Sequence, residues 1–253
     1  MKKILFRFIE RLGYTIARKK AGSVNIYPDI KDKDFWDVYN VCQPYSMAGV
    51  ERMFSLYTAV NYILSNNIKG DFVECGVWRG GSAMMIAKVL LSHNITDRKI
   101  FLYDTFEGMT APTTEDVSTT GVDATTMLEQ NKFSKDSRVW CYADLNDVQK
   151  NMRSTGFSQE KIVYVKGKVE ETIPGNMPNE NIALLRLDTD WYESTKHELI
   201  HLFPKLQIKG VLIIDDYGHW EGCKKAVDEY FEEHKINMLL NRVDYTCRVG
   251  VKL

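Results

Sequence analysis

The sequence lacks cysteines at metal-binding spacing, a long apolar run, and an excess of charge of either sign. Its five cysteines are odd in number and scattered, which argues against a disulfide framework or a zinc site and fits a reducing compartment. No apolar stretch approaches the roughly 20 residues that span a bilayer. A net charge of -1 gives no general attraction to nucleic acid or to an anionic membrane. We therefore expect a cytoplasmic protein that binds no nucleic acid.

The first 20 residues differ from the rest, because they are basic and their apolar side chains recur near helical spacing. We expect an amphipathic helix that packs on the main domain or on a partner subunit; reversible contact with a membrane surface is the alternative. We expect no signal peptide, since an uninterrupted apolar stretch and a small-residue cleavage site are both missing. Residues 1–48 are predicted to form an N-terminal helical extension with a loop over 21–48, and residues 49–253 a single domain.

Strand and helix patterns alternate along the main domain. The predicted strands are at 71–77, 100–106, 161–167, 182–188 and 210–216, and the predicted helices at 49–66, 78–93, 144–155, 193–206 and 222–234. This alternation indicates an α/β fold with a doubly wound, mostly parallel sheet. The last two short strands, 237–243 and 247–253, indicate an antiparallel hairpin at one edge.

Residues 107–130 interrupt this alternation. They are rich in threonine and acidic side chains, with glycine and proline among them. A loop of this length inside a compact domain is usually functional or disordered. We interpret it as a lid over the site, with a plain mobile insertion as the alternative.

A glycine-rich loop joins the first predicted strand to the following helix, at Glu74–Ser82. Gly76 permits a tight turn, while Gly80 and Gly81 permit close approach to the helix N-terminus, whose free N–H groups suit an anion. The spacing is neither that of a dinucleotide fingerprint nor that of a P-loop. Asp104 ends the next strand, where an acidic side chain suits the two hydroxyls of a ribose. The loop and Asp104 together indicate a nucleoside site, and glycines that serve only helix–strand packing are the alternative.

Four aspartates follow two later strands. Asp188 and Asp190 come after one, and Asp215 and Asp216 after the next. Such carboxylates repel one another when they are partly buried, and a cation relieves the repulsion. Oxygen ligands select a hard divalent ion, Mg²⁺ by default, with Mn²⁺ or Ca²⁺ possible. We predict Asp188, Asp215 and Asp216 as ligands and Asp190 as a general base; helix capping or pairing with Arg186 is the alternative.

Four ordered motifs make a resemblance specific: VECGVWRGGSA, LYDTFEGM, RLDTDWYEST and IIDDYGHWEGCKKAVDEYF. Over roughly residues 45–235 the chain resembles the macrocin O-methyltransferase family, metal-dependent enzymes that methylate sugar hydroxyls on macrolide and related antibiotics. The resemblance implies a Rossmann-like class I methyltransferase fold with a seven-stranded sheet. It implies S-adenosylmethionine as the methyl donor and Mg²⁺ as the metal.

The resemblance also implies roles for individual residues. It makes Asp188, Asp215 and Asp216 the metal ligands and Asp190 the base. Around the cofactor it places Glu74, Gly76 and Ser82 at the methionine part, Asp104 at the ribose, and the turn Gly167–Glu170, with Val169 and Glu170, beside the adenine. The segment 45–53, with Tyr45 and Met47, matches the family's entrance to the cofactor and acceptor pocket. These roles imply a direct in-line transfer, with the metal acidifying the acceptor hydroxyl and Asp190 removing its proton.

The acceptor is expected to be a sugar hydroxyl on a natural product or a surface glycan. Trp191, beside Asp190, is the tryptophan best placed to touch a sugar ring, and His219 either contacts the acceptor or begins the following helix. The apolar 49–66 segment and the N-terminal helix suggest a homo-oligomer, a dimer or larger.

Two other functions remain open at this point. A metal-dependent glycosyltransferase would use Asp188-Thr189-Asp190, although this leaves the glycine loop and the second aspartate pair unexplained. A non-catalytic member that binds the cofactor is the other alternative.

Overall fold

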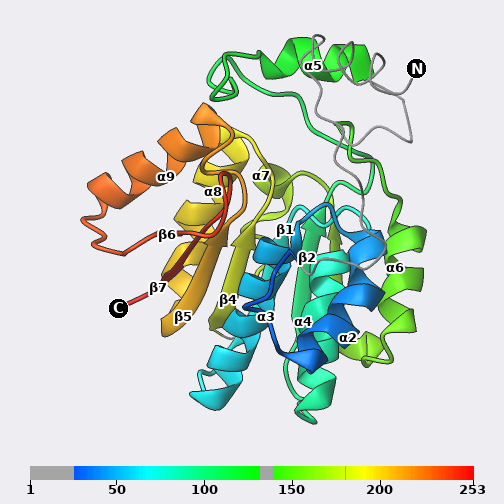
Figure 1. Cartoon of the computed structure of the whole chain (residues 1–253). Helices are drawn as coiled ribbons and strands as arrows, with labels where there is room; N and C mark the ends of the chain where they lie inside the picture. Colours follow the sequence, from blue (N-terminus) through cyan, green and yellow to red (C-terminus); the bar gives the residue numbers. More distant parts are fainter. Residues whose placement is uncertain (1–25, 132–138, 180) are drawn as a thin grey trace, which may run out of the picture. The chain divides into compact units, whose positions relative to one another are not determined.

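The computed structural model describes residues 26–131, 139–179 and 181–253 (Figure 1). The chain divides into two compact units, Met1–Lys33 and Asp34–Leu253. The helix predicted within residues 1–20 lies outside the described residues, so the second unit carries the fold and the site discussed below. No helix in the described ranges is long and apolar enough to cross a membrane.

Seven strands of the described chain form one sheet in the order β3-β2-β1-β4-β5-β7-β6. They are β1 (Asp71–Cys75), β2 (Ile100–Asp104), β3 (Ile162–Lys166), β4 (Ile182–Leu187), β5 (Leu206–Ile214), β6 (Asn241–Arg242) and β7 (Arg248–Val251). β1 to β5 pair in parallel, whereas β7 runs antiparallel to both β5 and β6. The predicted α/β fold, with a mostly parallel seven-stranded sheet and an antiparallel edge hairpin, is confirmed.

Helices cover the sheet on both faces, so β1 and β4 are buried along their whole length. The helices are α2 (Lys33–Cys42), α3 (Val50–Ser65), α4 (Gly81–Ser92), α5 (Ala124–Asn131), α6 (Leu145–Ser154), α7 (Val169–Thr172), α8 (Tyr192–Leu202) and α9 (Glu221–Glu233). In Figure 1, α3 and α4 lie in front of the sheet and α8 lies behind it. α4 packs against α3 and α6, while α8 packs against α7 and α9.

Two helices lie where the sequence pattern predicts loop. α2 occupies part of the 21–48 stretch and buries only Phe35 and Cys42, seven residues apart on one face. α5 occupies the end of the 107–130 segment, and the Asp123 carboxylate caps its first turn by accepting the Thr126 amide at 2.8 Å. Both loop predictions are wrong for these residues; each helix is short and buries only two residues, Phe35 and Cys42 in α2 and Ala124 and Leu128 in α5.

One boundary also differs from the prediction. α8 ends at Leu202 and a short 3₁₀ turn over Phe203–Lys205 follows, so β5 begins at Leu206 rather than at 210. Pro204 lies at the start of this turn, where its missing N–H leaves no hydrogen bond unmade. The sequence predicts a longer helix because the apolar pattern continues through Phe203 and Leu206.

The sheet register brings the predicted site residues to one edge. Leu187 of β4 lies between Cys75 of β1 and Ile214 of β5. The pairing continues one residue further, since the Asp188 amide donates to the Cys75 carbonyl and the Asp215 amide to the Leu187 carbonyl, both at 2.9 Å. The glycine loop after β1 and the aspartates after β4 and β5 are therefore neighbours at the carboxyl edge, where ligands bind in open α/β sheets.

Candidate active site

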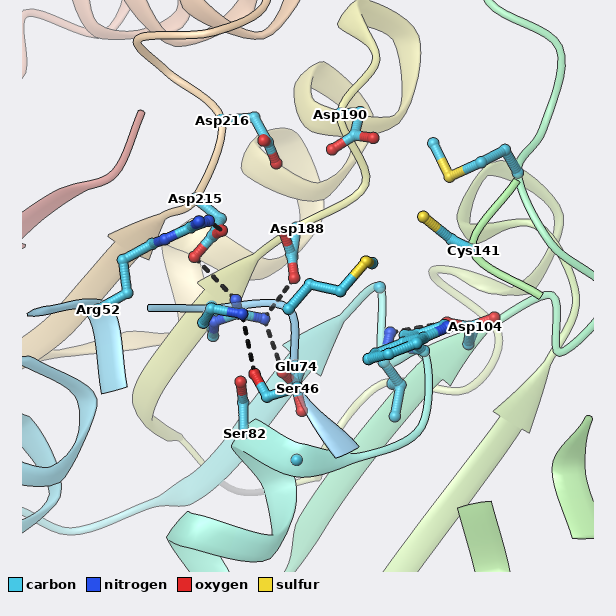
Figure 2. Close-up of a pocket in the computed structure, with 18 of the residues that line it drawn as sticks. Ser46, Arg52, Glu74, Ser82, Asp104, Cys141, Asp188, Asp190, Asp215 and Asp216 are labelled. Carbon is cyan, nitrogen blue, oxygen red and sulfur yellow. Dashed lines mark hydrogen bonds and ion pairs between the residues drawn. The ribbon is translucent and has the colours of Figure 1, made fainter. Parts of the chain in front are cut away.

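A cavity of about 310 Å³ opens at this edge, within the second unit. Figure 2 shows that the side chains around it come from α3, the glycine loop and the ends of β2, β4 and β5. The structure brings together most of the residues predicted from the sequence; those that line the cavity are Tyr45, Met47, Glu74, Gly76, Ser82, Asp104, Asp188, Asp190, Trp191, Asp215, Asp216 and His219.

Three aspartates form the only group in the described part of the chain arranged to hold a metal ion. Asp188, Asp215 and Asp216 each offer one carboxylate oxygen, and these oxygens lie within 4.8 Å of one another. Asp215 and Asp216 are buried, and Asp188 is half-buried. The Asp216 Oδ2 atom is buried and has no hydrogen-bond partner among the described residues. A buried carboxylate oxygen without a hydrogen-bond partner is a suitable ligand for a hard cation.

A buried arginine beneath the aspartates is the main feature that the sequence interpretation did not place in the site. Arg186, 4% exposed, donates to Glu74 Oε1 and Asp188 Oδ2 at 2.7 Å and to Asp215 Oδ1 at 2.8 Å. Arg52 of α3 also pairs with Asp215. The alternative that the aspartates pair with Arg186 thus occurs for Asp188 and Asp215, but not for Asp216.

The arginines only partly compensate the acidic side chains. Glu74 and the four aspartates face two guanidinium groups, Arg52 and Arg186. If all five carboxylates are ionised, negative charge remains in excess, which leaves room for a divalent cation. A signal for Arg186 was present in the sequence: it is the single charge within the apolar strand β4, and Glu74 of β1 lies directly opposite it in the register.

The ionisation of the aspartates follows from burial and from their partners. Burial, together with the charges of Asp215 and Asp216, raises the pKa of Asp188 despite Arg186, and burial together with Asp190 raises the pKa of Asp216. Burial opposes ionisation of Asp215 as well, but Arg186 and Arg52 outweigh it and hold its pKa below the usual value. Asp215 is thus the member of the cluster whose ionised form its partners favour.

Asp190 occupies a strained turn beside the cluster. Its φ is 68°, and the Trp191 amide donates to the Thr189 carbonyl at 2.8 Å, which closes a three-residue γ-turn around it. The carboxyls of Asp190 and Asp216 point toward one another (Figure 2). Burial raises the pKa of Asp190 to about 7, with the hydrogen bond from Asp216 lowering it and Asp188 raising it.

The glycine loop is shaped by close backbone approaches. Gly76 has a φ of 81°, and a Cβ there would overlap the Asp188 carbonyl oxygen. At Gly81 a Cβ would lie 2.6 Å from the Tyr45 carbonyl oxygen, because the segment before α3 crosses the N-terminus of α4. Gly80, with a φ of 88°, caps that helix in the left-handed region. The packing role that the sequence left as an alternative is therefore real for Gly76 and Gly81, and it does not exclude a ligand.

Asp104 organises the same loop. Its carboxylate accepts the backbone amides of Val77 at 2.6 Å and Trp78 at 3.2 Å through Oδ2, and that of Phe106 at 2.7 Å through Oδ1. Burial raises its pKa, and these backbone donors lower it. Asp104 also lines the cavity, so the hydrogen bonds hold it at the place predicted for a ribose.

The residues predicted to lie beside the adenine line a smaller adjoining cavity of about 60 Å³. Gly76, Asp104 and Asp188 line this cavity as well. Gly167, Val169 and Glu170 all border it. Glu170 accepts the Ser194 hydroxyl at 2.6 Å through Oε1, while its Oε2 is buried without a partner among the described residues. Like Glu74, whose Oε2 is in the same state, it presents a free acceptor to whatever fills the site.

Aromatic side chains form the wall beyond Asp190. Trp191 is 1% exposed and donates through Nε1 to the Thr110 carbonyl at 3.1 Å. Its ring meets Trp220 edge to face at 5.0 Å, and His219 lies 4.8 Å from Trp220. His219 precedes α9 rather than beginning it, and it lines the cavity. The sequence interpretation missed Trp220, Arg52 and Cys141 as lining residues.

The predicted lid segment borders the same cavity. Gly108, Met109 and Met127 line it. The Thr119 amide donates to the His219 carbonyl at 2.9 Å, and the fully buried Asp116 accepts the Tyr192 amide at the start of α8 at 2.8 Å. The segment is thus attached to the elements that carry the aromatic wall; that it opens and closes remains a prediction.

Comparison with known proteins gives the class of the protein. The solved structure of the O-methyltransferase NovP is 30% identical, with a TM-score of 0.71 and 82% of both chains covered. A calicheamicin methyltransferase, 17% identical with a TM-score of 0.60, covers 86% of this chain and 91% of its own and shares the fold. The fold is that of class I methyltransferases.

The family follows from the sequence comparisons. The macrocin-O-methyltransferase family model matches residues 7–250, further in both directions than the 45–235 expected from the motifs. The demethyldecarbamoylnovobiocin O-methyltransferase of Streptomyces niveus is 32% identical over 186 residues, which make up 74% of this chain and 67% of that protein. The mycinamicin III 3''-O-methyltransferase of Micromonospora griseorubida is 32% identical over 200 residues, 79% of this chain and 75% of that protein. The chain belongs to the macrocin O-methyltransferase family and is an O-methyltransferase; neither the glycosyltransferase nor the non-catalytic alternative is supported.

Proposed function

We propose that this O-methyltransferase transfers the methyl group of S-adenosylmethionine to a sugar hydroxyl of a natural product or surface glycan, with Mg²⁺ held by Asp188, Asp215 and Asp216. The observation that carries the proposal is the convergence of three carboxylate oxygens within 4.8 Å, one of them on a residue with an unpartnered buried oxygen. The cluster lies beside a cavity at the carboxyl edge of a class I methyltransferase sheet.

The cavity offers hydrogen-bond acceptors and donors that complement the polar groups of the cofactor. The buried, unpartnered Oε2 of Glu74 suits the ammonium group of the methionine part, and the free N–H groups at the start of α4, near Gly80 and Ser82, suit its carboxylate. On the other side of Asp104, the unpartnered Oε2 of Glu170 suits the exocyclic amine of adenine. S-adenosylmethionine supplies an electrophilic methyl group on a sulfonium.

The aspartate cluster fits a divalent cation in ligand type and in charge. Carboxylate oxygens are the ligands that Mg²⁺ prefers, and Mn²⁺ is the closest substitute. When bound, such a cation lowers the pKa of a hydroxyl that it coordinates. Arg186 holds Asp188 through Oδ2 and Asp215 through Oδ1, while Arg52 pairs with Asp215 Oδ2, so a cation would share Asp215 with the two arginines.

Asp190 is the proposed general base. Burial raises its pKa to about 7 in the absence of a cation, and a cation on the neighbouring aspartates would favour its ionised, proton-accepting form. The γ-turn directs Asp190 toward Asp216 and the cavity, so its carboxylate takes the proton of a hydroxyl presented beside the metal ligands. Asp190 performs this step itself.

The aromatic wall supports a sugar acceptor. Trp191, Trp220 and His219 present flat, amphipathic surfaces next to the base, and such surfaces suit a sugar ring. One relative, from Streptomyces olivaceus, is named for a rhamnosyl-bearing tetracenomycin acceptor and is 30% identical over 246 residues, 97% of this chain and 88% of that protein.

Calorimetry tests the cofactor, and isotope transfer tests the reaction. S-adenosylhomocysteine should bind with and without Mg²⁺, whereas a nucleoside-diphosphate sugar should not bind as a substitute for it. Methyl transfer from labelled S-adenosylmethionine to a panel of glycosides should depend on Mg²⁺ and stop with EDTA. Binding of the nucleotide sugar alone would refute the proposal, and transfer that EDTA leaves unchanged would refute its metal.

A further inference from the structure

A fully buried carboxyl group lies below the site and takes no part in it directly. Glu198, on the inner face of α8, is 0% exposed. The Thr189 hydroxyl donates to both of its oxygens, at 3.0 Å to Oε1 and 3.2 Å to Oε2. The Cys75 thiol at the end of β1 also hydrogen-bonds to it. Glu198 thus links α8 to the residue between Asp188 and Asp190.

Glu198 has no ionic partner to explain its burial. The charged groups that face it are the acidic Glu170 and Asp188, and no lysine or arginine of the described residues forms an ion pair with it. Burial raises its pKa well above the usual value, while the hydrogen bonds from Thr189 and Cys75 lower it. A buried polar group of this kind is less favourable for stability than a well-packed apolar side chain, which suggests that its position serves another purpose.

The residue it holds lies in the turn that carries the proposed chemistry. Thr189 provides the carbonyl that closes the γ-turn. Asp190 has a positive φ, which residues other than glycine rarely adopt. A strained backbone persists only where its surroundings fix it. On one side the buried Trp191 is fixed by its bond to the Thr110 carbonyl. On the other side the Thr189 hydroxyl is fixed by Glu198.

We propose that Glu198 is a positioning residue that acts through Thr189 to hold the turn, so that Asp188 and Asp190 face the same cavity. The inference rests on the proposed metal site, because Asp188 is one of its ligands. It differs from a purely structural role in one respect: loss of the Thr189 hydroxyl should weaken the metal site more than it weakens the fold. Glu198 touches neither reactant and is not a catalytic residue.

Mn²⁺ binding tests this positioning role of Glu198 and requires no methyl-acceptor substrate. Full-length wild-type protein and the variants Thr189→Val, Thr189→Ser and Glu198→Gln are titrated with Mn²⁺ by electron paramagnetic resonance, and their thermal midpoints are measured. Thr189→Val should bind Mn²⁺ about 10- to 100-fold more weakly, as expected for the loss of a group that orients a ligand. Thr189→Ser keeps the hydroxyl and Glu198→Gln keeps a side-chain oxygen that can accept it, so both should stay within about threefold of wild type.

Thr155→Val is the control, because it removes a buried threonine hydroxyl that donates to the Met152 carbonyl at 2.7 Å at the end of α6, outside the turn that carries Asp188 and Asp190. It should lower the thermal midpoint and leave Mn²⁺ affinity unchanged. Wild-type affinity in Thr189→Val, or an equal loss in Thr155→Val, would overturn the inference and leave the proposed function standing. A wild-type protein that binds no Mn²⁺ would refute the proposed metal site and this inference with it.

Discussion

Arg186 is the residue on which the acidic site depends for its stability. Its guanidinium donates to Glu74, Asp188 and Asp215, all within 2.8 Å. Removal of one partner from a buried ion pair leaves the others uncompensated in a medium of low dielectric constant. The same group that lowers the pKa of Asp215 thus also compensates three acidic side chains that share the cavity wall.

We predict that Arg186→Met lowers the free energy of unfolding by about 3–5 kcal/mol. Urea denaturation measures this change. Arg79→Met is the control, since Arg79 is 36% exposed and its pair with Asp147 is worth at most about 1 kcal/mol. Equal stability of the two variants would show that Arg186 is not the main compensating charge.

Asp188 and Asp190 have different predicted roles although only one residue, Thr189, separates them. Asp190→Asn should keep Mn²⁺ and S-adenosylhomocysteine binding but slow methyl transfer by about 10²- to 10⁴-fold, because a general base is lost. Asp188→Asn should lose Mn²⁺ affinity. If Asp190→Asn loses the metal and Asp188→Asn keeps it, the two roles are reversed.

At the scale of elements, the glycine loop is fastened to α6. The Asp147 carboxylate accepts Arg79 Nε at 2.8 Å, and this hydrogen bond is the main cause that lowers the Asp147 pKa. A carboxyl group with a lowered pKa in the fold stabilises it above its unfolded pKa, about 3.9, and this contribution is lost as pH falls through the folded value.

Asp147→Asn should therefore be slightly less stable than wild type near neutral pH, and the difference should shrink as the pH falls below about 4. The effect is at most about 1 kcal/mol, since the Asp147 side chain is 31% exposed and solvent screens the pair. Thermal unfolding of both proteins across this range measures it. A difference that grows on acidification would contradict the assignment.

The segment between β2 and α6 is attached to the site through Asp116. Its buried carboxylate accepts the Tyr192 amide through Oδ1 and the Thr113 amide and hydroxyl through Oδ2. Asp116→Ala leaves these donors unsatisfied, so we expect a loss of about 1–3 kcal/mol and faster proteolysis within residues 107–131. Glu115→Gln is the control, because Glu115 only forms an exposed pair with Lys225. Equal cleavage rates in the two variants would show that Asp116 does not anchor the segment.

The elements differ in how well the sequence predicted them. β1 and β4 are buried on both faces, so their continuous apolar runs identify them. α2 and α5 are short and each buries only two residues, and they were predicted as loop. The convergence of the glycine loop and the aspartates was predictable, because it depends only on the strand order. The pairing of Arg186 with Glu74 was not, because it also depends on the register between β1 and β4.

At the scale of the whole molecule, family and fold are settled and several predictions remain untested. The family model covers residues 7–250, and the seven-stranded sheet is the expected one. The cytoplasmic location, the homo-oligomer and the membrane contact of the N-terminal helix stay predictions. These properties depend on residues outside the described ranges or on partners, and no chemistry of the site determines them.

The central claim is that an O-methyltransferase site here holds a divalent cation on three aspartates. The most direct test is an anomalous difference map from crystals grown with Mn²⁺ and S-adenosylhomocysteine. We predict one peak at about 2.1 Å from carboxylate oxygens of Asp188, Asp215 and Asp216, next to the cofactor product. A site that holds the cofactor product and has no peak at these aspartates, or a peak bound elsewhere, would contradict the account.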